Sequence, residues 1–371
     1  MRRDTFGLVF SNANEALIRD LTEERCFGSV PFGGRYRMID FVLSNMVHAG
    51  MSKVGIITTT NYRSLMDHLG SGKPWDLARK KDGIIIFPPY ITNGIVPRYN
   101  RVTELNAILR VLALTEQEYV FCTDCDVVCN LDIDDIAQFH FDKQADVTLV
   151  YKHGPIPLNQ ENRMVVQCGP NGRVREILIS PHTEEERDVC LNMAFVRKSL
   201  LISLIQDAVS RNYTSIGRDI FQRELSNLRV FGYRLGGYSA VIDSMQGYLQ
   251  ANMALLERKV RKELFLPERP IYTKVRDEMP TRYGLGSTVK NCLIADGCII
   301  EGRVENSVLF RGVKVGKGAT VRNCVIMQGS DIGENANLAY VIADKDVSVL
   351  PGRVLVGYET YPAYISKGTA V

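Results

Sequence analysis

The sequence predicts a two-part α/β protein, in which a domain built on a mostly parallel β-sheet precedes a C-terminal left-handed parallel β-helix. Apolar strands alternate with helical segments over the first part, and a motif recurs about every 17 residues in the second. Glycine supports this division, because 12 of the 30 glycines fall in the last 88 residues. We therefore expect a first domain at residues 1–250, a connector at 251–286 and the β-helix at 287–371.

The first domain alternates short apolar strands with amphipathic helices. The expected strands, each an apolar or β-branched run, span residues 6–10, 54–60, 119–123 and 146–151. The expected helices span residues 38–48 and 103–114, and Gly50 is a natural stop for the first of them. Buried strands separated by helices form parallel sheets covered on both faces. Ligands of such sheets bind at the carboxyl ends of the strands.

The connector is expected to hold one charged amphipathic helix at residues 251–265. Pro267, Pro270 and Pro280 follow it and are typical of a linker.

The last region repeats one pattern, an asparagine followed by Cys or Ser and two aliphatic residues. Its copies lie at residues 291–294, 306–309 and 323–326, with a looser fourth at 339–342. A period near 17 corresponds to three six-residue strands, which is one coil of a triangular left-handed β-helix. Each coil buries its aliphatic corner by stacking on the next. A Greek-key barrel with chance sequence similarity between its strands is the alternative to the β-helix. In a β-helix, the unpaired edges of the end coils favour oligomerisation.

Composition excludes several classes of protein. The net charge of +3 argues against a general nucleic-acid binder. We expect no membrane partner, because the sequence contains no apolar run of 18 residues. The nine cysteines are odd in number and scattered, which favours a reducing compartment and a cytoplasmic location.

The most distinctive stretch is residues 31–45, Pro-Phe-Gly-Gly-Arg-Tyr-Arg-Met-Ile-Asp-Phe-Val-Leu-Ser-Asn. Together with residues 71–77 and the repeats, it resembles the ADP-glucose pyrophosphorylase (glucose-1-phosphate adenylyltransferase) family, from about Gly7 to Gly357. The resemblance implies a Rossmann-like nucleotidyltransferase domain followed by a left-handed β-helix. In such enzymes a sugar phosphate attacks the α-phosphate of ATP and pyrophosphate leaves. Glycine-loop amides, basic side chains and carboxylate-held Mg²⁺ neutralise the charge.

The positions that match the family's phosphate loop have lost its glycines and its arginine. Ser11, Asn12 and Asn14 stand where the glycines would be, and Ala16 replaces the arginine. Asparagine tolerates left-handed dihedrals, so the shape of the loop is expected to survive in part. The positive charge is gone, and Glu15 adds a negative one.

Three further catalytic positions have also changed. By the resemblance, Phe27 replaces a lysine that faces phosphate, and Ser180 replaces a lysine that grips the sugar phosphate. Val241 replaces one of two metal-holding aspartates, and Asp124, which matches the other, is left as a vestigial carboxylate. Since one transition-state donor is worth ~10²–10³ in rate, we expect no catalytic residues and no metal site.

This pattern resembles the D-type subunits of the family, which assemble with a catalytic C-type (GlgC-type) subunit into a heterotetramer for glycogen synthesis. The resemblance implies a non-catalytic or weakly catalytic regulatory subunit that needs no cofactor and acts by allosteric coupling. One alternative is an active ATP:glucose-1-phosphate adenylyltransferase, which would require Mg²⁺ and ATP. Another is a sensor that binds nucleotide or sugar phosphate. A homo-oligomer is a further possibility.

Enzymes of this family bind anionic effectors near the junction of their two domains. The resemblance places Arg25 and Arg37 at basic positions of that region, and Lys345 and Lys367 close to it. These four residues are the candidate effector-binding residues. For each of them, a solvated cation or a domain-interface ion pair is the alternative.

Cys122, Cys125 and Cys129 have the C-x₂-C-x₃-C spacing that zinc or iron–sulfur sites also use. The first lies in an expected buried strand, and no second Cys/His cluster is near in sequence, so we expect ordinary buried thiols. The repeat region lacks histidine, which argues against the acyltransferase chemistry of other hexapeptide-repeat proteins.

Overall fold

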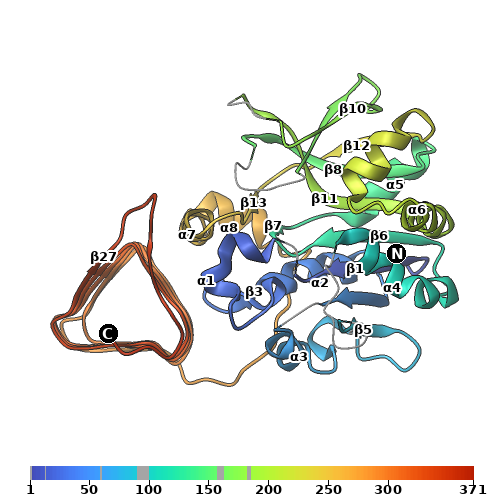
Figure 1. The fold of residues 1–371 in the computed structure, drawn as a ribbon. Helices are drawn as coiled ribbons and strands as arrows, with labels where there is room; N and C mark the ends of the chain where they lie inside the picture. Colours follow the sequence, from blue (N-terminus) through green and yellow to red (C-terminus); the bar gives the residue numbers. More distant parts are fainter. Residues whose placement is uncertain (1, 13, 59–60, 90–99, 157–162, 182–184) are drawn as a thin grey trace.

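The computed structural model describes residues 2–12, 14–58, 61–89, 100–156, 163–181 and 185–371. An α/β domain and a triangular β-helix lie side by side and are joined by an extended segment (Figure 1). Within the described residues, no helix combines the length and the apolar character that crossing a membrane requires.

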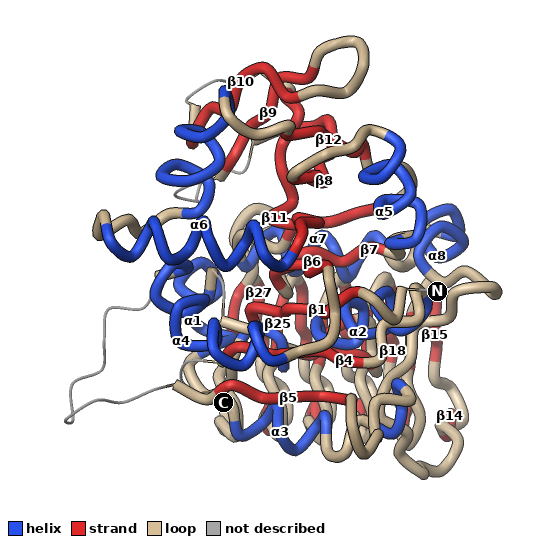
Figure 2. Tube along the Cα trace, turned by 90° about the vertical axis from the view of Figure 1, so that its right-hand side faces the viewer, coloured by secondary structure: helices blue, strands red, loops and turns tan. Residues whose placement is uncertain are grey.

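The α/β domain is built on a nine-stranded sheet whose main path runs β10-β9-β11-β6-β1-β4-β5. Its strands are β1 (Thr5–Phe10), β4 (Lys53–Ile57), β5 (Gly83–Phe87), β6 (Tyr119–Asp124), β8 (Val147–Gly154), β9 (Met164–Cys168), β10 (Val174–Ile179), β11 (Arg187–Arg197) and β12 (Val230–Arg234). Strands β6, β1, β4 and β5 are parallel, and Figure 2 shows β1, β4 and β5 one below another. Strand β11 runs antiparallel to β6 and β8. The four parallel strands, together with β12 and β8, which are parallel to each other, confirm the expected mostly parallel sheet.

Helices cover both faces of this sheet. They are α1 (Arg19–Thr22), α2 (Met38–His48), α3 (Arg63–Leu69), α4 (Arg101–Leu114), α5 (Ile133–Asp142), α6 (Lys198–Ser210), α7 (Met245–Ala254) and α8 (Arg258–Leu264). Strand β1 shows why two faces are needed, because successive side chains of a strand point to opposite sides. Leu8 packs in one apolar core with α4, whereas Val9 packs in another with α2.

The predicted elements of this domain are present, with small differences in their bounds. Helix α2 has the bounds expected of it, and α4 begins two residues earlier than expected. The strand expected at 54–60 ends at Ile57, and residues 59–60 lie outside the described part of the chain.

The prediction of a single helix at residues 251–265 is wrong, because α7 ends at Ala254 and α8 begins at Arg258. Leu255 and Leu264 are both fully buried. Nine residues at 3.6 per turn would place them on opposite faces of a straight helix. The break at Glu257, whose backbone is extended, lets both leucines reach the core.

The C-terminal region is a left-handed β-helix made of three parallel five-stranded sheets, which confirms the repeat interpretation. One sheet holds β14 (Arg282–Tyr283), β17 (Ile299–Ile300), β20 (Lys314–Val315), β23 (Asp331–Ile332) and β26 (Ser348–Val349). The second holds β15 (Thr288–Lys290), β18 (Arg303–Glu305), β21 (Thr320–Arg322), β24 (Asn337–Ala339) and β27 (Val354–Val356). The third holds β16 (Leu293–Ile294), β19 (Val308–Leu309), β22 (Val325–Ile326), β25 (Val341–Ala343) and β28 (Ala363–Ile365).

The repeated asparagines turn the chain at one corner of the triangle. Asn291, Asn306 and Asn323 have φ of 51°, 44° and 53°, a left-handed conformation that asparagine adopts more readily than most residues. The fourth copy lies one residue later than expected, at 340–343, because Val325 and Ile326 pair with Ile342 and Ala343. Tyr340 therefore occupies the asparagine place in that copy, with φ 52°. Stacking of the coils holds this corner even where the residue is a poor choice for it.

Short strands outside the main sheets and one tether complete the fold. β2 (Pro31–Phe32) pairs with β3 (Tyr36–Arg37), and β7 (Val127–Cys129) pairs with β13 (Ser239–Val241). The connector after α8 is held against α2, since the Tyr272 N–H donates to Ser44 Oγ at 2.8 Å. The connector to the β-helix is therefore attached to the helix that forms the second half of the distinctive motif.

Substitution of Gly302 by alanine is expected to destabilise the β-helix. The added Cβ would lie 2.5 Å from the Ala319 carbonyl oxygen and 2.6 Å from that of Gly316. Overpacking against backbone costs ~1–3 kcal/mol, and urea denaturation would measure this loss. Gly236→Ala is the control, because its Cβ would meet no heavy atom of the described chain within 4 Å. Equal stability of the two variants would contradict the close packing of the coils.

Candidate functional site

Asp124 ends strand β6 beside Phe10, the last residue of β1, so it lies at the edge of the sheet where a ligand is expected. The carboxylate is buried, and both of its oxygens accept hydrogen bonds from nitrogen. Arg101 forms an ion pair with Oδ1, and the Asn192 amide donates to Oδ2 at 3.0 Å. The vestigial carboxylate is thus engaged by this chain's own side chains.

Asn192 reaches Asp124 because β11 is irregular at that point. The pairing of β11 with β8 shifts between Cys190 and Met193, and Asn192 has φ 55°. A β-bulge re-aims a side chain and is common next to functional sites.

A second buried carboxylate, Asp126, lies just beyond the end of β6. It forms an ion pair with Arg163 at 3.2 Å, and both side chains are fully buried. The Asn14 amide donates to Asp126 Oδ2 at 2.7 Å. Burial raises the pKa of Asp126, while the Arg163 charge opposes the shift. This network ties the degenerate loop to the edge of the sheet.

The degenerate loop keeps part of its shape and loses its cation. Asn14 has φ 62°, the left-handed conformation that the sequence analysis expects of it. Ala16 is exposed, whereas Phe27 is fully buried in the apolar core. The Phe27 N–H donates to Glu15 Oε1 at 3.2 Å. This backbone N–H, which faces the loop, is therefore already bonded to a carboxyl group of the chain.

The other two replaced positions belong to the same edge of the sheet. Ser180 has φ 46° and exchanges hydrogen bonds with Arg163: its N–H donates to the Arg163 carbonyl at 2.8 Å, and its Oγ accepts from the Arg163 N–H at 3.2 Å. Val241 pairs with Val127 in the short β13–β7 sheet, and the next residue, Ile242, donates its N–H to the Asp126 carbonyl at 2.8 Å. Neither position supplies a cation or a carboxylate.

A cavity of about 370 Å³ opens in front of Asp124. Its polar lining includes Arg101, Asn192 and Arg218, and Phe10 and Phe221 are among its apolar residues. A volume of this size is at the small end of ligand pockets.

Sequence reasoning missed Arg101, Arg163 and Asn192. For Arg101 a signal existed, since it is the first residue of α4 and a cation at a helix N-terminus opposes the helix dipole. Nothing local marks Arg163, which lies 37 residues from Asp126 in the chain.

The cysteine motif belongs to the core. Cys125 and Cys129 are buried, and Cys122 is half-buried at the edge of the cavity. Burial raises the pKa of the Cys129 thiol to about 12.

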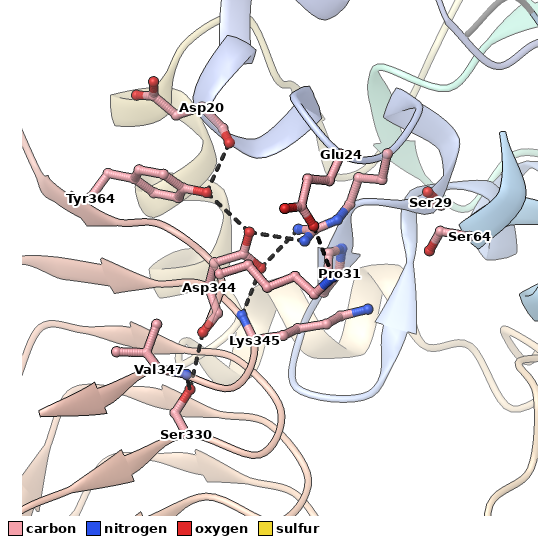
Figure 3. Close-up of polar contacts among 12 residues, drawn as sticks. Asp20, Glu24, Ser29, Pro31, Ser64, Ser330, Asp344, Lys345, Val347 and Tyr364 are labelled. Atoms are coloured by element: carbon pink, nitrogen blue, oxygen red, sulfur yellow. Dashed lines mark hydrogen bonds and ion pairs between the residues drawn. The ribbon is translucent and has the colours of Figure 1, made fainter. Parts of the chain in front are cut away.

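The candidate effector residues divide into two groups at the domain junction. Arg25 donates two hydrogen bonds to Asp344 of the β-helix, each at 2.9 Å, and both side chains are buried. The Tyr364 hydroxyl donates to the same carboxylate at 3.0 Å (Figure 3). Lys367 pairs with Glu24 at 2.8 Å on the surface. These two cations already have partners within the chain.

Arg37 and Lys345 come together in a small basic pocket of about 40 Å³ between the domains. Sequence reasoning missed the other cations of this pocket, which are Arg35, Lys274, Arg276 and Arg311. Burial, with the charges of Arg37 and Arg25, lowers the pKa of Lys345 to about 7. Burial also lowers the pKa of Arg37 to about 10. This concentration of positive charge suits an anion.

Fold and site together define a nucleotidyltransferase scaffold joined to a hexapeptide β-helix. Residues 17–256 match the nucleotidyl transferase family model, and residues 278–361 match the GlmU-like C-terminal hexapeptide model. The chain therefore belongs to the nucleotidyl transferase family. The relatives described next place it with the glucose-1-phosphate adenylyltransferases (ADP-glucose pyrophosphorylases) of that family.

Among its relatives are proteins named glycogen biosynthesis protein GlgD. The one from Bacillus subtilis is 37% identical over 98% of this chain and 95% of its own. The one from Geobacillus stearothermophilus is 40% identical over 85% of this chain and 82% of its own. A glucose-1-phosphate adenylyltransferase from Thermosipho africanus is 31% identical over 85% of this chain and 77% of its own.

Loss of the Arg25–Asp344 pair is expected to destabilise the protein strongly. Arg25→Ala leaves the Asp344 carboxylate buried without its cation, which costs ~3–5 kcal/mol. Lys367→Ala is the matched control, since its pair with Glu24 is exposed and worth under about 1 kcal/mol. Chemical denaturation measures both losses. A similar small loss for the two variants would show that the buried pair does not support the junction.

Glu15 is expected to make stability fall as pH rises. Burial raises the pKa of its carboxyl from 4.5 to about 7, although hydrogen bonds from Phe27 and Asn12 oppose the shift. Between these values the folded state holds a proton that the unfolded state has released, so folding becomes less favourable with increasing pH. The stability of Glu15→Gln relative to wild type should therefore rise from pH 4.5 to 7 and then level off.

Denaturation midpoints at pH 5 and pH 8 check this expectation. Glu24→Gln is the control, because its hydrogen bond with Lys367 lowers the pKa of Glu24 and places its titration below this window. A pH-independent difference between Glu15→Gln and wild type would overturn the assignment.

Proposed function

We propose that this chain is a non-catalytic regulatory subunit of a bacterial glucose-1-phosphate adenylyltransferase, acting in glycogen biosynthesis with a catalytic GlgC-type subunit. The names of its relatives support the pathway and the enzyme class. The observation that carries the proposal is the state of Asp124. Both of its oxygens accept hydrogen bonds, from Arg101 and from Asn192. The position that matches the family's second metal-holding aspartate is Val241, which has no carboxylate.

The phosphate-facing positions point the same way. Ala16 and Phe27 have no charge to offer a triphosphate, and Glu15 supplies no cation either. Nucleotidyl transfer depends on such charge neutralisation. Binding energy is thus missing at the point where charge accumulates in the transition state.

Assembly is supported by apolar side chains at both ends of the β-helix. Leu285 and Tyr283 are exposed at the first coil, and Val354, Tyr358 and Tyr361 are exposed at the last. Exposed apolar patches mark interaction surfaces. A heterotetramer would cover them.

Regulation is supported by the basic junction pocket. Arg35, Arg37 and Lys345 converge there from both domains. An anionic effector bound between them would contact two domains at once, and preferential binding to one arrangement would shift the equilibrium toward it. The relation between the domains would in turn influence a bound partner subunit.

The cavity at Asp124 favours a second function, that of a sensor. It retains Asn192, Arg101 and an apolar wall, which could hold a nucleotide or sugar phosphate without turning it over. Calorimetric titration with ATP and with glucose 1-phosphate distinguishes a sensor from a purely structural subunit.

The purified chain should show negligible turnover with ATP, glucose 1-phosphate and Mg²⁺, because charge neutralisation is absent. A kcat near ~10 s⁻¹, typical of enzymes, would contradict the proposal. Mixed with a GlgC-type subunit, the chain should co-elute with it and change its apparent affinities or effector response. The catalytic subunit alone is the control, and no complex with no kinetic change would overturn the regulatory role.

A further inference from the structure

The carboxylates that follow β6 do not fit the Mg²⁺ that the family implies. Mg²⁺ requires hard oxygen ligands in near-octahedral geometry and gives up its water reluctantly. At Asp124, Oδ1 accepts from Arg101 and Oδ2 from Asn192. At Asp126, Oδ2 accepts from Arg163 and Asn14. Val241, where the family has an aspartate, supplies no oxygen from its side chain.

Arg101 is held in place by the ends of two neighbouring elements. Asn100 caps helix α4 by accepting from the Thr103 N–H at 3.0 Å, which places Arg101 in the first turn. The guanidinium carbon lies 3.9 Å from the centre of the Phe10 ring. Phe10 is the β1 neighbour of Asp124 across the sheet. The strand that carries the carboxylate and the strand that supports the guanidinium are therefore paired.

The surroundings of Arg101 are those of a bound cation. Burial alone lowers the pKa of Arg101, but the charges of Asp124 and Glu104 outweigh it and hold the value above its usual range. Burial raises the pKa of Glu104, and the Arg101 charge opposes that shift. Carboxylates in this position need a positive charge, and the guanidinium supplies it.

We propose that Arg101 is a built-in cation that takes the place of a divalent metal ion at Asp124 and keeps such ions out of the site. A guanidinium differs from Mg²⁺ in this role because it is tethered to the chain, carries one positive charge and interacts by donating N–H hydrogen bonds, not by coordinating oxygen. The inference goes beyond the regulatory role, since it concerns how the edge of the sheet keeps its charge balance without a metal ion.

Removal of the guanidinium should open a latent cation site. Mn²⁺ is the probe, and electron paramagnetic resonance of free Mn²⁺ measures binding without any enzymatic activity. Wild type should show no Mn²⁺ site that depends on Asp124. Arg101→Ala should gain one site that binds Mn²⁺ at least about tenfold more tightly than any residual surface binding by wild type, a difference of ~1.4 kcal/mol. Adding Asp124→Asn to that variant should abolish the gain.

Three further variants make the result decisive. Arg101→Gln removes the charge while keeping most of the side chain, and it replaces the alanine variant if that one fails to fold. Arg101→Lys retains a cation and should stay closed to Mn²⁺. Arg218→Ala is the matched control, because Arg218 lines the same cavity but pairs with Asp219. It should gain no site.

Thermal melting gives an independent reading, since a ligand that binds the folded state raises the melting temperature. Millimolar Mn²⁺ should raise the melting temperature of Arg101→Ala and leave that of wild type unchanged. Asp124-dependent Mn²⁺ binding by wild type would overturn the proposal, and so would the absence of a gain in both Arg101→Ala and Arg101→Gln. Neither outcome bears on assembly with a catalytic subunit, so this test and that of the proposed function fail separately.

Discussion

The ion pair between Arg25 and Asp344 is the interaction on which the relation of the two domains depends. Its members are 319 residues apart in the chain and are joined by two hydrogen bonds in a buried position. A buried carboxylate is costly without a cation, so the α/β domain and the β-helix satisfy each other's charge only in this arrangement. The next residue, Lys345, is thereby brought among the cations of the junction pocket. The Arg25–Asp344 ion pair therefore also positions one of the cations of the junction pocket.

The same electrostatic requirement organises the edge of the sheet. Asp124 and Asp126 end a buried strand, where carboxylates cannot remain without positive charge. Arg101 and Arg163 supply that charge from a helix N-terminus and from the start of a β-hairpin. A metal ion can leave a site or bring phosphate with it, whereas a side chain does neither. In the exchange that we propose, the guanidinium keeps the charge of Asp124 balanced but does not supply the phosphate chemistry of a metal ion.

Local patterns in the sequence predicted most of the fold. Helix α2 has the expected bounds, because apolar spacing and a terminal glycine are local features, and the β-helix repeats were visible since each coil repeats the same corner. The break between α7 and α8 was not visible, since the charged helical pattern continues through Glu257 and only tertiary burial of Leu255 and Leu264 explains it.

The sequence predicted which family residues the candidate site lacks, but it did not predict which side chains pair with the remaining carboxylates. Ala16 and Val241 could be recognised by comparison with a family pattern, position by position. Arg101 and Arg163 reach their carboxylates from 23 and 37 residues away, so no short motif contains both partners. Asn192 depends on a bulge in β11, which arises from the pairing of strands.

The two charged regions differ in a way that assigns them different tasks. At the sheet edge, Asp124 is paired with Arg101 and Asp126 with Arg163, so the carboxylates are already neutralised and offer an incoming cation no free ligand. At the junction, Arg35, Arg37, Arg276, Arg311 and Lys345 face one pocket, and repulsion among them helps to lower the pKa values of Arg37, Arg311 and Lys345. An anion would relieve that repulsion and bind both domains. Binding free energy can therefore be coupled to domain arrangement at the junction, which is where the proposed regulatory subunit would exert control.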